Sequence, residues 1–309
     1  MPVSLLYRFI IYKKRSTFLS NPPQKHGIPI VVVGNIYVGG TGKTPIVIYL
    51  VNLLKEKGYK PAVISRGYGA NIEKLTIVCK SSKPSDVGDE PLLIFNSCKV
   101  PVVVNPDRNA SVRYILENHD CDIIISDDGL QHYDLNRDIE LVVFDGQKGI
   151  GNGFLLPAGP LRESVGRAKQ ADFVLINGSS SFLQGENFYL DINYAINMVS
   201  GEQVSLAHLA QAIDKIHAVA GIGNPERFFA QLESKGFVVI RHEFGDHYPY
   251  TEQTLDFIDG CPVVMTEKDA VKCMAFAKED WWMVPASVRF KSDFGVRFLE
   301  LIKQNITPS

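Results

Sequence analysis

The chain has 309 residues, a length that predicts one large domain or two domains of ordinary size. Hydrophobic residues make up 45% of the sequence and charged residues 21%, which excludes a disordered, collagen-like or coiled-coil protein. The 32 basic residues are balanced by 34 acidic ones, so we expect no nucleic-acid partner. The five cysteines are scattered without a Cys-x-x-Cys pair; this spacing indicates neither a zinc site nor a disulfide framework and fits a reducing cytosol.

The N-terminal segment is basic and partly apolar. Residues 1–27 contain no acidic residue, and their basic residues are Arg8, Lys13, Lys14, Arg15 and Lys25. The apolar run at 5–12 is far shorter than the ~20 residues of a spanning helix, and it lacks a signal-peptide cleavage site. Two interpretations stay open here: residues 1–24 lie in the membrane interface with their basic groups on anionic headgroups, or they form an ordinary first helix over a core.

A glycine-rich loop follows the first predicted strand. Residues 28–33 form an apolar, β-branched run typical of a strand buried on both faces, and residues 45–58 predict a helix that ends at a glycine. The backbone N–H groups of the loop between them would hold nucleotide phosphates, with Lys43 on the outer phosphates and Thr44 on magnesium. The expected nucleotide-binding residues are Tyr37, Val38, Gly39, Gly40, Thr41, Gly42, Lys43 and Thr44. Tyr37 stands where the usual pattern has glycine, so a purely structural turn is the alternative.

Further apolar strands alternate with helical stretches. They are expected at 61–64, 100–104, 122–126, 141–144 and 173–176. This alternation predicts a P-loop NTPase-like three-layer α/β sandwich, whose ligands bind at the carboxyl ends of the strands. Asp127 and Asp128 follow one strand directly, as in a Walker B element that organises Mg²⁺, although Asp-Gly alone is a turn signal.

Other polar residues lie in positions that a bare ATPase leaves unexplained. Asp89 comes before an apolar helix, where it could simply cap the helix. Arg108 follows a strand and could clamp a phosphate. Arg162 and Glu163 close a Pro/Gly-rich loop and are expected to form a buried ion pair. The guanine-binding pattern Asn/Thr-Lys-x-Asp is absent, since residues 266–269 read Thr-Glu-Lys-Asp; adenine nucleotide is therefore favoured.

Taken together, these strings resemble the tetraacyldisaccharide 4'-kinase family, the lipid A 4'-kinases of Gram-negative bacteria. The similarity runs in order from residue 33 to residue 272 and therefore covers nearly the whole chain. The matching strings are Val33-Gly34-Asn35, Gly39-Gly40-Thr41-Gly42-Lys43-Thr44-Pro45, Ser65-Arg66-Gly67-Tyr68-Gly69, Gly88-Asp89-Glu90-Pro91, Asp127-Asp128-Gly129-Leu130-Gln131-His132, Gly151-Asn152-Gly153, Leu156-Pro157-Ala158-Gly159-Pro160-Leu161-Arg162-Glu163, the run from Ala220 to Phe229, Asp246-His247 and the run from Thr266 to Lys272. A tyrosine at the position of Tyr37 is consistent with the family's own pattern.

The resemblance implies a reaction and roles for residues. ATP would give its γ-phosphate to the 4'-hydroxyl of an acylated glucosamine disaccharide 1-phosphate, with Mg²⁺ as the metal. Asp89 would accept the hydroxyl proton and His247 would orient or tune Asp89. The remaining implied assignments are Thr44, Asp128, Asp127 and Glu163 to the metal and Arg108, Gln131, His132 and Arg162 to the substrate. The resemblance further implies work at the cytoplasmic face of the bacterial inner membrane, contacted through residues 1–20, and no obligate protein partner.

The second half of the chain predicts a separate, smaller domain. The expected division is a P-loop kinase domain at 25–186, a β-hairpin linker at 187–208 and a smaller α/β domain at 209–309. The last helix, at 294–302, could pack on either domain. For Asp89 and His247 to act together the two domains must meet, so the active site is expected in the cleft between them.

Two other functions fit parts of the sequence. A membrane-associated P-loop ATPase switch would share the Gly-Lys-Thr loop, but it would act on a protein partner and need no Asp89–His247 pair. A lipid-binding protein without enzymatic activity would have the loop as a structural turn and would not bind Mg²⁺–ATP. Transfer of label from ATP to a lipid disaccharide separates both from the kinase.

Overall fold

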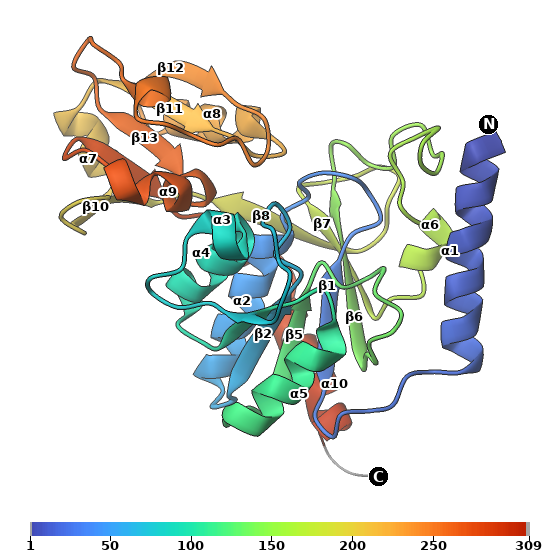
Figure 1. The fold of residues 1–309 in the computed structure, drawn as a ribbon. Helices are drawn as coiled ribbons and strands as arrows, with labels where there is room; N and C mark the ends of the chain where they lie inside the picture. The colour runs from blue at the N-terminus through green and yellow to red at the C-terminus, as the bar shows by residue number, and fades with distance from the viewer. Residues whose placement is uncertain (1, 307–309) are drawn as a thin grey trace.

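The computed structural model describes residues 2–306, and most of its strands belong to one large, mainly parallel sheet (Figure 1). The strand order is β15-β8-β7-β6-β1-β5-β2-β4-β3, in which β15 and β3 pair antiparallel to their neighbours at the two edges. The bounds are β1 Ile30–Gly34, β2 Pro61–Ser65, β3 Thr76–Ile77, β4 Val102–Val104, β5 Ile123–Asp127, β6 Ile139–Asp145, β7 Phe173–Asn177, β8 Glu186–Asp191 and β15 Ser287–Phe290.

Helices cover both faces of this sheet. Alternate residues of a strand point to opposite faces, so Val31 and Val33 of β1 join one apolar core and Ile30 and Val32 join the other. The first core contains residues of α2 (Lys43–Glu56), α4 (Asp89–Cys98) and α10 (Phe294–Ile306), and the second contains residues of α5 (Arg108–Asn118) and α6 (Val165–Ala168). The short α3 spans Pro84–Val87. The predicted three-layer α/β sandwich is therefore confirmed.

A second sheet of six strands forms the smaller domain, in the order β10-β9-β14-β13-β11-β12. Its bounds are β9 Tyr194–Asn197, β10 Gln203–Ser205, β11 Lys215–Ala220, β12 Val238–Glu243, β13 Val263–Thr266 and β14 Trp281–Val284. The helices between these strands are α7 Leu206–Ala212, α8 Pro225–Ser234, η1 Gln253–Leu255, α9 Glu267–Cys273 and η2 Met274–Phe276. Its two apolar cores are separate from those of the large sheet.

The chain passes between the two sheets twice. Residues 187–208, expected as one hairpin linker, give β8 to the large sheet and an antiparallel β9–β10 pair to the small one. Later, β15 and α10 return to the large sheet, where Phe294 and Phe298 of α10 are fully buried. Residues 287–306 of the expected smaller domain thus pack with the large sheet, and residues 307–309 lie outside the described part. Sequence periodicity could not assign α10 because its apolar stripe fits either core.

The N-terminal helix α1 (Pro2–Ser20) lies along the edge of the large domain near α6 (Figure 1). One stripe of it faces the protein: the Ser4 hydroxyl donates to the Leu155 carbonyl at 3.0 Å, and the Tyr7 hydroxyl donates to the Arg162 carbonyl at 3.0 Å. Phe18 packs on Tyr133 with ring centroids 5.5 Å apart. Among residues 2–306, no helix combines the length and apolar character needed to cross a bilayer.

Candidate active site

The glycine-rich loop connects the end of β1 to the start of α2. Gly39 and Gly42 have φ values of 106° and 96°, a region that residues with a Cβ rarely adopt. At these two glycines the backbone reverses its direction after β1, and α2 begins directly afterwards at Lys43. The first N–H groups of a helix lack partners within it and carry the positive end of its dipole. The loop and α2 therefore form a turn whose geometry suits an anion, at the carboxyl edge of the sheet.

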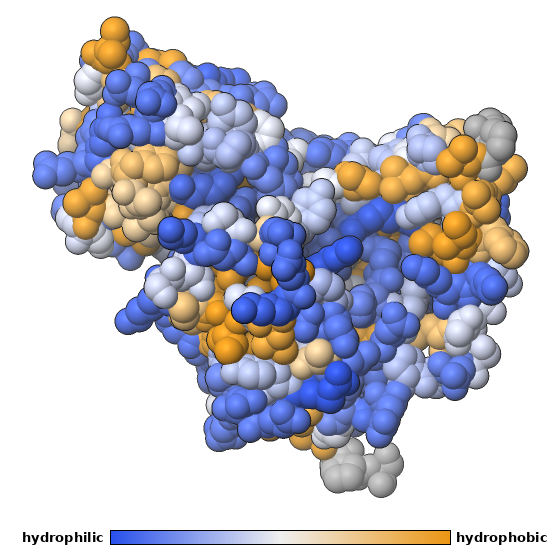
Figure 2. Space-filling view, in the orientation of Figure 1, coloured by the Kyte–Doolittle hydropathy of each residue, from blue (hydrophilic) through white to orange (hydrophobic). Residues whose placement is uncertain are grey.

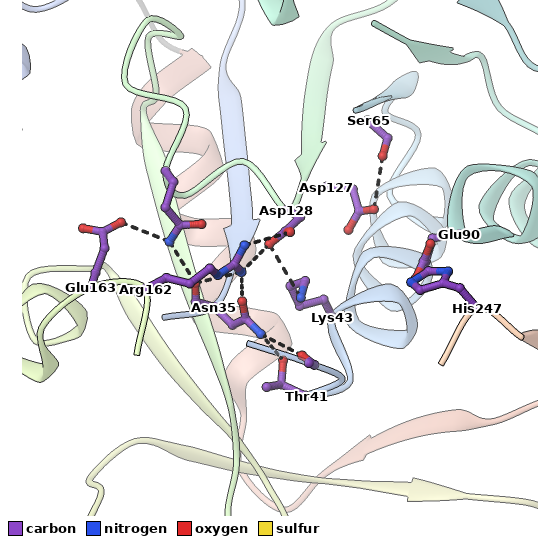
Figure 3. Close-up of polar contacts among 12 residues, drawn as sticks. Asn35, Thr41, Lys43, Ser65, Glu90, Asp127, Asp128, Arg162, Glu163 and His247 are labelled. Atoms are coloured by element: carbon purple, nitrogen blue, oxygen red, sulfur yellow. Dashed lines mark hydrogen bonds and ion pairs between the residues drawn. The ribbon is translucent and has the colours of Figure 1, made fainter. Parts of the chain in front are cut away.

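Asn35, directly after β1, holds this loop in shape. It is fully buried, and its Nδ2 donates to the Gly39 carbonyl and to the Thr41 hydroxyl, both at 3.2 Å (Figure 3). The following segment is braced by the 154–163 loop, because the Val38 N–H donates to the Pro160 carbonyl at 3.0 Å. From the sequence, Asn35 was given no role in the site. The signal that could have found it is a polar residue at the carboxyl end of a buried strand.

Asp128 lies where two cations converge. Its carboxylate accepts a bidentate pair of hydrogen bonds from Arg162 at 2.8 and 3.1 Å, and Lys43 Nζ lies 3.6 Å from it (Figure 3). Burial opposes its ionisation, but Lys43 and then Arg162 outweigh that effect and lower the pKa of Asp128 to about 2. The side chain is therefore an anion at neutral pH. Arg162 fixes it beside the lysine that would contact phosphate.

Asp127 has an open carboxylate oxygen. The side chain is buried; Oδ2 accepts from the Ser65 hydroxyl at 3.4 Å, whereas Oδ1 has no hydrogen-bond partner among the described residues. Burial first, then the charges of Asp128 and Glu90, raise the pKa of Asp127 to about 7. An unpartnered, desolvated carboxylate oxygen beside a second carboxylate is the donor type that Mg²⁺ prefers. The residues present thus fit a magnesium ion.

Arg108, assigned to the substrate, is almost entirely buried and bonded to the protein. Its guanidinium donates to the carbonyls of Asn105 and Asp127, both at 3.1 Å, and burial lowers its pKa to about 10 despite the nearby carboxylates. Its Nε has no partner among the described residues. Arg108 therefore holds the backbone that carries Asp127, with one N–H left over.

Glu163 and Gln131 form a network beside the loop. Gln131 Nε2 donates to the Asn35 carbonyl and to Glu163, both at 3.0 Å, and the Tyr133 hydroxyl donates to the other Glu163 oxygen at 2.6 Å. The expected ion pair between Arg162 and Glu163 is wrong, because Glu163 pairs instead with Arg167 at 3.7 Å. Adjacent residues of a loop point apart, and each finds a partner on another element. Both Glu163 oxygens are engaged in this network, and among the described residues it has no hydrogen bond or ion pair with Lys43 or Asp128.

His132 lies next to this network. Burial lowers the pKa of its imidazole, with Arg108 adding to the effect, so the ring is neutral near pH 7. The His132 carbonyl accepts a hydrogen bond from Arg137, which anchors the turn after Asp128. The Thr44 side chain lies in the first turn of α2, beside Lys43.

Asp89 and His247 meet across the two domains. Asp89 is the first residue of α4, and His247 lies in the loop after β12; His247 Nδ1 is 3.0 Å from Asp89 Oδ2. The hydrogen bond to Asp89 raises the pKa of His247, against burial and the charge of Lys268. His247 has a φ of 60°, a strained backbone conformation that persists only where the surroundings hold it. The two residues are 158 positions apart in the sequence and hydrogen-bonded in the fold.

Lys268 joins the same cluster from α9. Its Nζ lies 2.6 Å from Glu90 and 2.7 Å from Asp246, and His247 Nε2 is 3.7 Å from Glu90. From the sequence, Lys268 and Glu90 were named within strings that match the family, and Lys268 also within the failed guanine motif, but neither was given a role in the site. The signal was available, since Lys268 follows β13 at the carboxyl edge of the small sheet. This bridge fixes the loop that carries His247 to α4.

The glycine-rich loop also contacts the small domain. A Cβ added at Gly40 would lie 3.0 Å from the Gly223 Cα, and Lys148 Nζ donates to the Gly223 carbonyl at 2.6 Å. Beside this contact, residues of the two domains line a cavity of about 600 Å³ that is open to solvent. Its polar lining includes Gln147, Asn177, Tyr189, Arg227, Gln231 and Lys235. Asn177 links the cavity to the loop through a hydrogen bond of 3.4 Å from Nδ2 to the Thr41 carbonyl.

Comparisons with known proteins agree along the whole chain. The family model described as tetraacyldisaccharide-1-P 4'-kinase matches residues 1–303. The tetraacyldisaccharide 4'-kinase of Pseudomonas fluorescens (strain SBW25) is 44% identical over 315 residues, covering 99% of this chain and 94% of the relative. That of Shewanella denitrificans is 44% identical over 300 residues, covering 95% and 89%. A crystal structure of LpxK from Aquifex aeolicus in complex with ATP superposes with a TM-score of 0.82 at 26% identity, covering 99% of this chain and 98% of that one.

Proposed function

The chain belongs to the tetraacyldisaccharide-1-P 4'-kinase family, and from that premise we infer its reaction. It is an ATP-dependent kinase that transfers the γ-phosphoryl group of ATP to the 4'-hydroxyl of tetraacyldisaccharide 1-phosphate. The product is lipid IVA, and the step belongs to lipid A biosynthesis. The observation that carries this conclusion is the match over residues 1–303, together with a loop, a cationic group and a carboxylate pair at one sheet edge. Nothing in the comparisons favours the ATPase-switch alternative.

Loop residues 37–44 and the first turn of α2 hold the ATP phosphates. Phosphoryl transfer depends mainly on positioning and on neutralising charge, and Lys43 supplies the charge at this turn. Arg162 keeps Asp128 ionised beside Lys43, so the lysine is aimed before nucleotide arrives. Of the four residues assigned to the substrate, Arg162 and His132 remain the better candidates for contact, whereas Arg108 and Gln131 position the residues around them.

The magnesium ion would be held by Asp127, Asp128 and the Thr44 hydroxyl. Bound there, Mg²⁺ supplies charge neutralisation on the β- and γ-phosphate oxygens. Asp127 offers an oxygen without a hydrogen-bond partner. Asp128 has the lower pKa of the two and therefore offers a charged carboxylate. Glu163 is left as a positioning residue, because its contacts are with Gln131, Tyr133 and Arg167, whereas Asp128 lies beside Lys43.

Asp89 is the proposed acceptor of the 4'-hydroxyl proton. His247 holds one oxygen of Asp89 through a hydrogen bond, and this bond raises the pKa of His247, which favours a positively charged imidazolium beside the Asp89 side chain. Lys272 Nζ, 3.8 Å from the same oxygen, adds to this effect. In a loose transition state the carboxylate acts chiefly by aiming the hydroxyl. His247 and Lys272 act through Asp89.

The substrate carries acyl chains, so we place the enzyme at the cytoplasmic face of the bacterial inner membrane. The outward side of α1 exposes large apolar residues, and Figure 2 shows hydrophobic side chains along the edge where α1 lies. They are Val3, Leu5, Leu6, Phe9, Ile10, Tyr12 and Leu19. Such a helix would lie in the interface with Arg8, Lys13 and Lys14 on the headgroups. Met1, the first residue of the proposed segment, lies outside the described residues.

The division into functional parts follows from these assignments. We propose a membrane-associating segment at 1–24, a kinase domain built on the large sheet and a smaller domain built on the second sheet, with the active site where Asp89 meets His247. The chain acts without an obligate protein partner.

One assay tests the proposed function. The purified protein is incubated with Mg²⁺, radiolabelled ATP and a detergent-dispersed acylated disaccharide 1-phosphate. Label should appear in the lipid, and Lys43→Ala should abolish this transfer. Hydrolysis of ATP without lipid labelling would instead indicate an ATPase.

A further inference from the structure

A second group of chemically reactive side chains gathers inside the small domain. His217 lies on β11 and His242 on the neighbouring β12, while Asp259 and Cys261 lie on the loop before β13. His217 is 5% exposed and is therefore buried in the domain, whereas the Asp259 side chain is 41% exposed and opens to solvent. None of these residues belongs to the proposed kinase site.

The group lies away from the contact with the large domain. Cys261 comes before the first residue of β13, and His217 is in the first half of β11. Gly223 and Lys268, which contact the large domain, follow the carboxyl ends of these same two strands. Because β11 and β13 are parallel, the two locations are toward opposite edges of the small sheet (Figure 1).

Both nitrogens of the His217 ring have a polar partner, and an aromatic ring stacks on it. Its Nε2 lies 2.8 Å from Asp259 Oδ1, and its Nδ1 lies 2.8 Å from His242 Nε2. Phe257 stacks on the His217 ring at a centroid distance of 4.0 Å and on the His242 ring at 4.2 Å. One nitrogen of His217 is thus aimed at the carboxylate, and the other is hydrogen-bonded to a second imidazole, the arrangement that orients a metal-binding histidine.

The atoms have the spacing of a small metal site. One ligand atom each from His217, Asp259 and Cys261 lie within 4.8 Å of one another. A tetrahedral zinc ion, with bonds of about 2.0–2.3 Å, needs ligands roughly 3.3–3.8 Å apart, which side-chain rotation of Asp259 and Cys261 can reach. Imidazole, thiolate and carboxylate together suit zinc and exclude the all-oxygen preference of Mg²⁺. We propose that His217, Asp259 and Cys261 bind one Zn²⁺ ion, with His242 as a positioning residue and water as the fourth ligand.

Binding changes the protons of the group in a defined way. Cys261 loses its thiol proton to solvent. In the metal-free site His217 Nε2 donates to the Asp259 carboxylate, so binding moves the ring proton from Nε2 to Nδ1 by exchange with solvent and frees Nε2 for the metal. Nδ1 then donates to His242 Nε2, and His242 carries its own proton on Nδ1. Thiolate and imidazole bind a metal only in their deprotonated forms, so protons compete for the site as pH falls. Lys215, whose Nζ is 3.9 Å from Asp259, is a positive charge that opposes the ion weakly because both groups are exposed.

The experiment uses the full chain, stripped with a chelator and dialysed against Zn²⁺ without nucleotide. About one equivalent of zinc should remain bound per chain at neutral pH and dissociate as pH falls. Co²⁺ in place of zinc should give an intense near-ultraviolet thiolate-to-metal band together with tetrahedral visible bands. His217→Gln and Cys261→Ser should lose the equivalent. His242→Gln should weaken zinc binding by about 10–100-fold, as expected for an outer partner.

The matched control is Cys79→Ser, because Cys79 is an exposed thiol on the other domain. Circular dichroism and lipid kinase activity check that each variant is folded. A Co²⁺ spectrum without the thiolate band, or zinc retained by folded Cys261→Ser, would overturn the proposal. Because no nucleotide or lipid is present, loss of zinc binding and loss of kinase activity are separate results.

Discussion

The backbone of Gly40 in the glycine-rich loop contacts the backbone of Gly223 in the small domain. A Cβ on Gly223 would lie 2.7 Å from both the Cα and the carbonyl oxygen of Gly40, distances at which one backbone must move. Both domains therefore determine the shape of the glycine-rich loop. The small domain contributes this backbone contact to the site as well as the His247 side chain.

The first prediction concerns this contact. Gly223→Ala should displace the glycine-rich loop, because the new methyl group meets backbone that cannot rotate away. A displacement of this size in a positioning element is expected to lower kcat/KM for ATP by about 10–100-fold. Steady-state kinetics with varied ATP measure it. Gly166→Ala is the control, since a Cβ there meets nothing closer than the Ser164 hydroxyl at 3.9 Å. Unchanged ATP kinetics in folded Gly223→Ala would show that the contact does not shape the loop.

The second prediction concerns Asp89 and His247. Asp89→Asn and His247→Gln should each lower kcat by about 100-fold or more while nucleotide binding survives, because Asp89 acts on the attacking hydroxyl and His247 acts through Asp89. Pre-steady-state phosphotransfer and binding of a fluorescent ATP analogue separate the two effects. A loss of nucleotide affinity equal to the loss of rate would place the pair in ATP binding.

The same pair predicts a pH dependence of stability. The folded-state pKa of His247 lies above its ordinary 6.5, so its ion pair with Asp89 contributes fully below pH 6.5 and is lost as pH rises through the raised value. The Tm advantage of the wild type over His247→Gln should therefore shrink as pH rises above 6.5. The exposed His208, changed to Gln, should show no such trend. An advantage that grows with pH would contradict the assignment.

Local signals explain which parts of this site the sequence could predict. The first strand and its Gly-Lys-Thr loop form one continuous stretch of sequence, and Asp127–Asp128 form another with the strand before them. Each stretch is short, so it indicates both the residues and their local geometry. The role of Asn35 was not predicted because this residue holds the loop through hydrogen bonds and belongs to no catalytic motif. Lys268 escaped because its partner Glu90 is 178 residues away, a distance over which no periodicity carries information. The β15–α10 return to the large sheet was likewise set by packing, which a stripe of apolar residues does not specify.

The third prediction concerns Asp127, whose buried charge is expected to lower the stability of the folded protein. Its folded-state pKa is raised from the ordinary 3.8 to about 7, so the buried charge costs stability as pH rises through that range and the full cost persists above it. Asp127→Asn should therefore raise Tm above pH 7 and leave it nearly unchanged near pH 4. The variant should lose most kinase activity, because the amide is a poor magnesium ligand. Thermal unfolding across pH measures the first effect and lipid labelling the second.

The control for this prediction is the exposed Asp134, whose change to Asn should leave Tm unaltered at every pH. Mg²⁺ with ATP should raise the Tm of the wild type more than that of Asp127→Asn, since ligands that bind the folded state stabilise it by mass action. A variant less stable than the wild type at pH 8 would mean that Asp127 is already paired in the apo protein.

The fourth prediction concerns α1 as a membrane-interface helix. Leu5, Phe9 and Tyr12 are spaced i, i+4 and i+7 on the outward face and are 64%, 63% and 71% exposed. Changing all three to Ser removes apolar surface that is mostly exposed, whereas the contacts of Tyr7 and Phe18 that hold the helix on the domain are kept. At roughly 1.5 kcal/mol for each side chain buried in lipid, binding to anionic vesicles should fall by more than about 100-fold. Sedimentation with vesicles measures it.

Charge and location supply the controls for α1. Changing Arg8, Lys13 and Lys14 to Gln should weaken vesicle binding mainly at low salt, because the basic side chains act through a screened potential. Ile258→Ser removes an apolar residue that is 98% exposed on the small domain, and it should leave binding intact. The Ser variant of α1 should keep its rate on detergent-dispersed substrate and lose rate only on substrate in vesicles. If it phosphorylated both equally, the outward face of α1 would not be what brings the active site to the lipid.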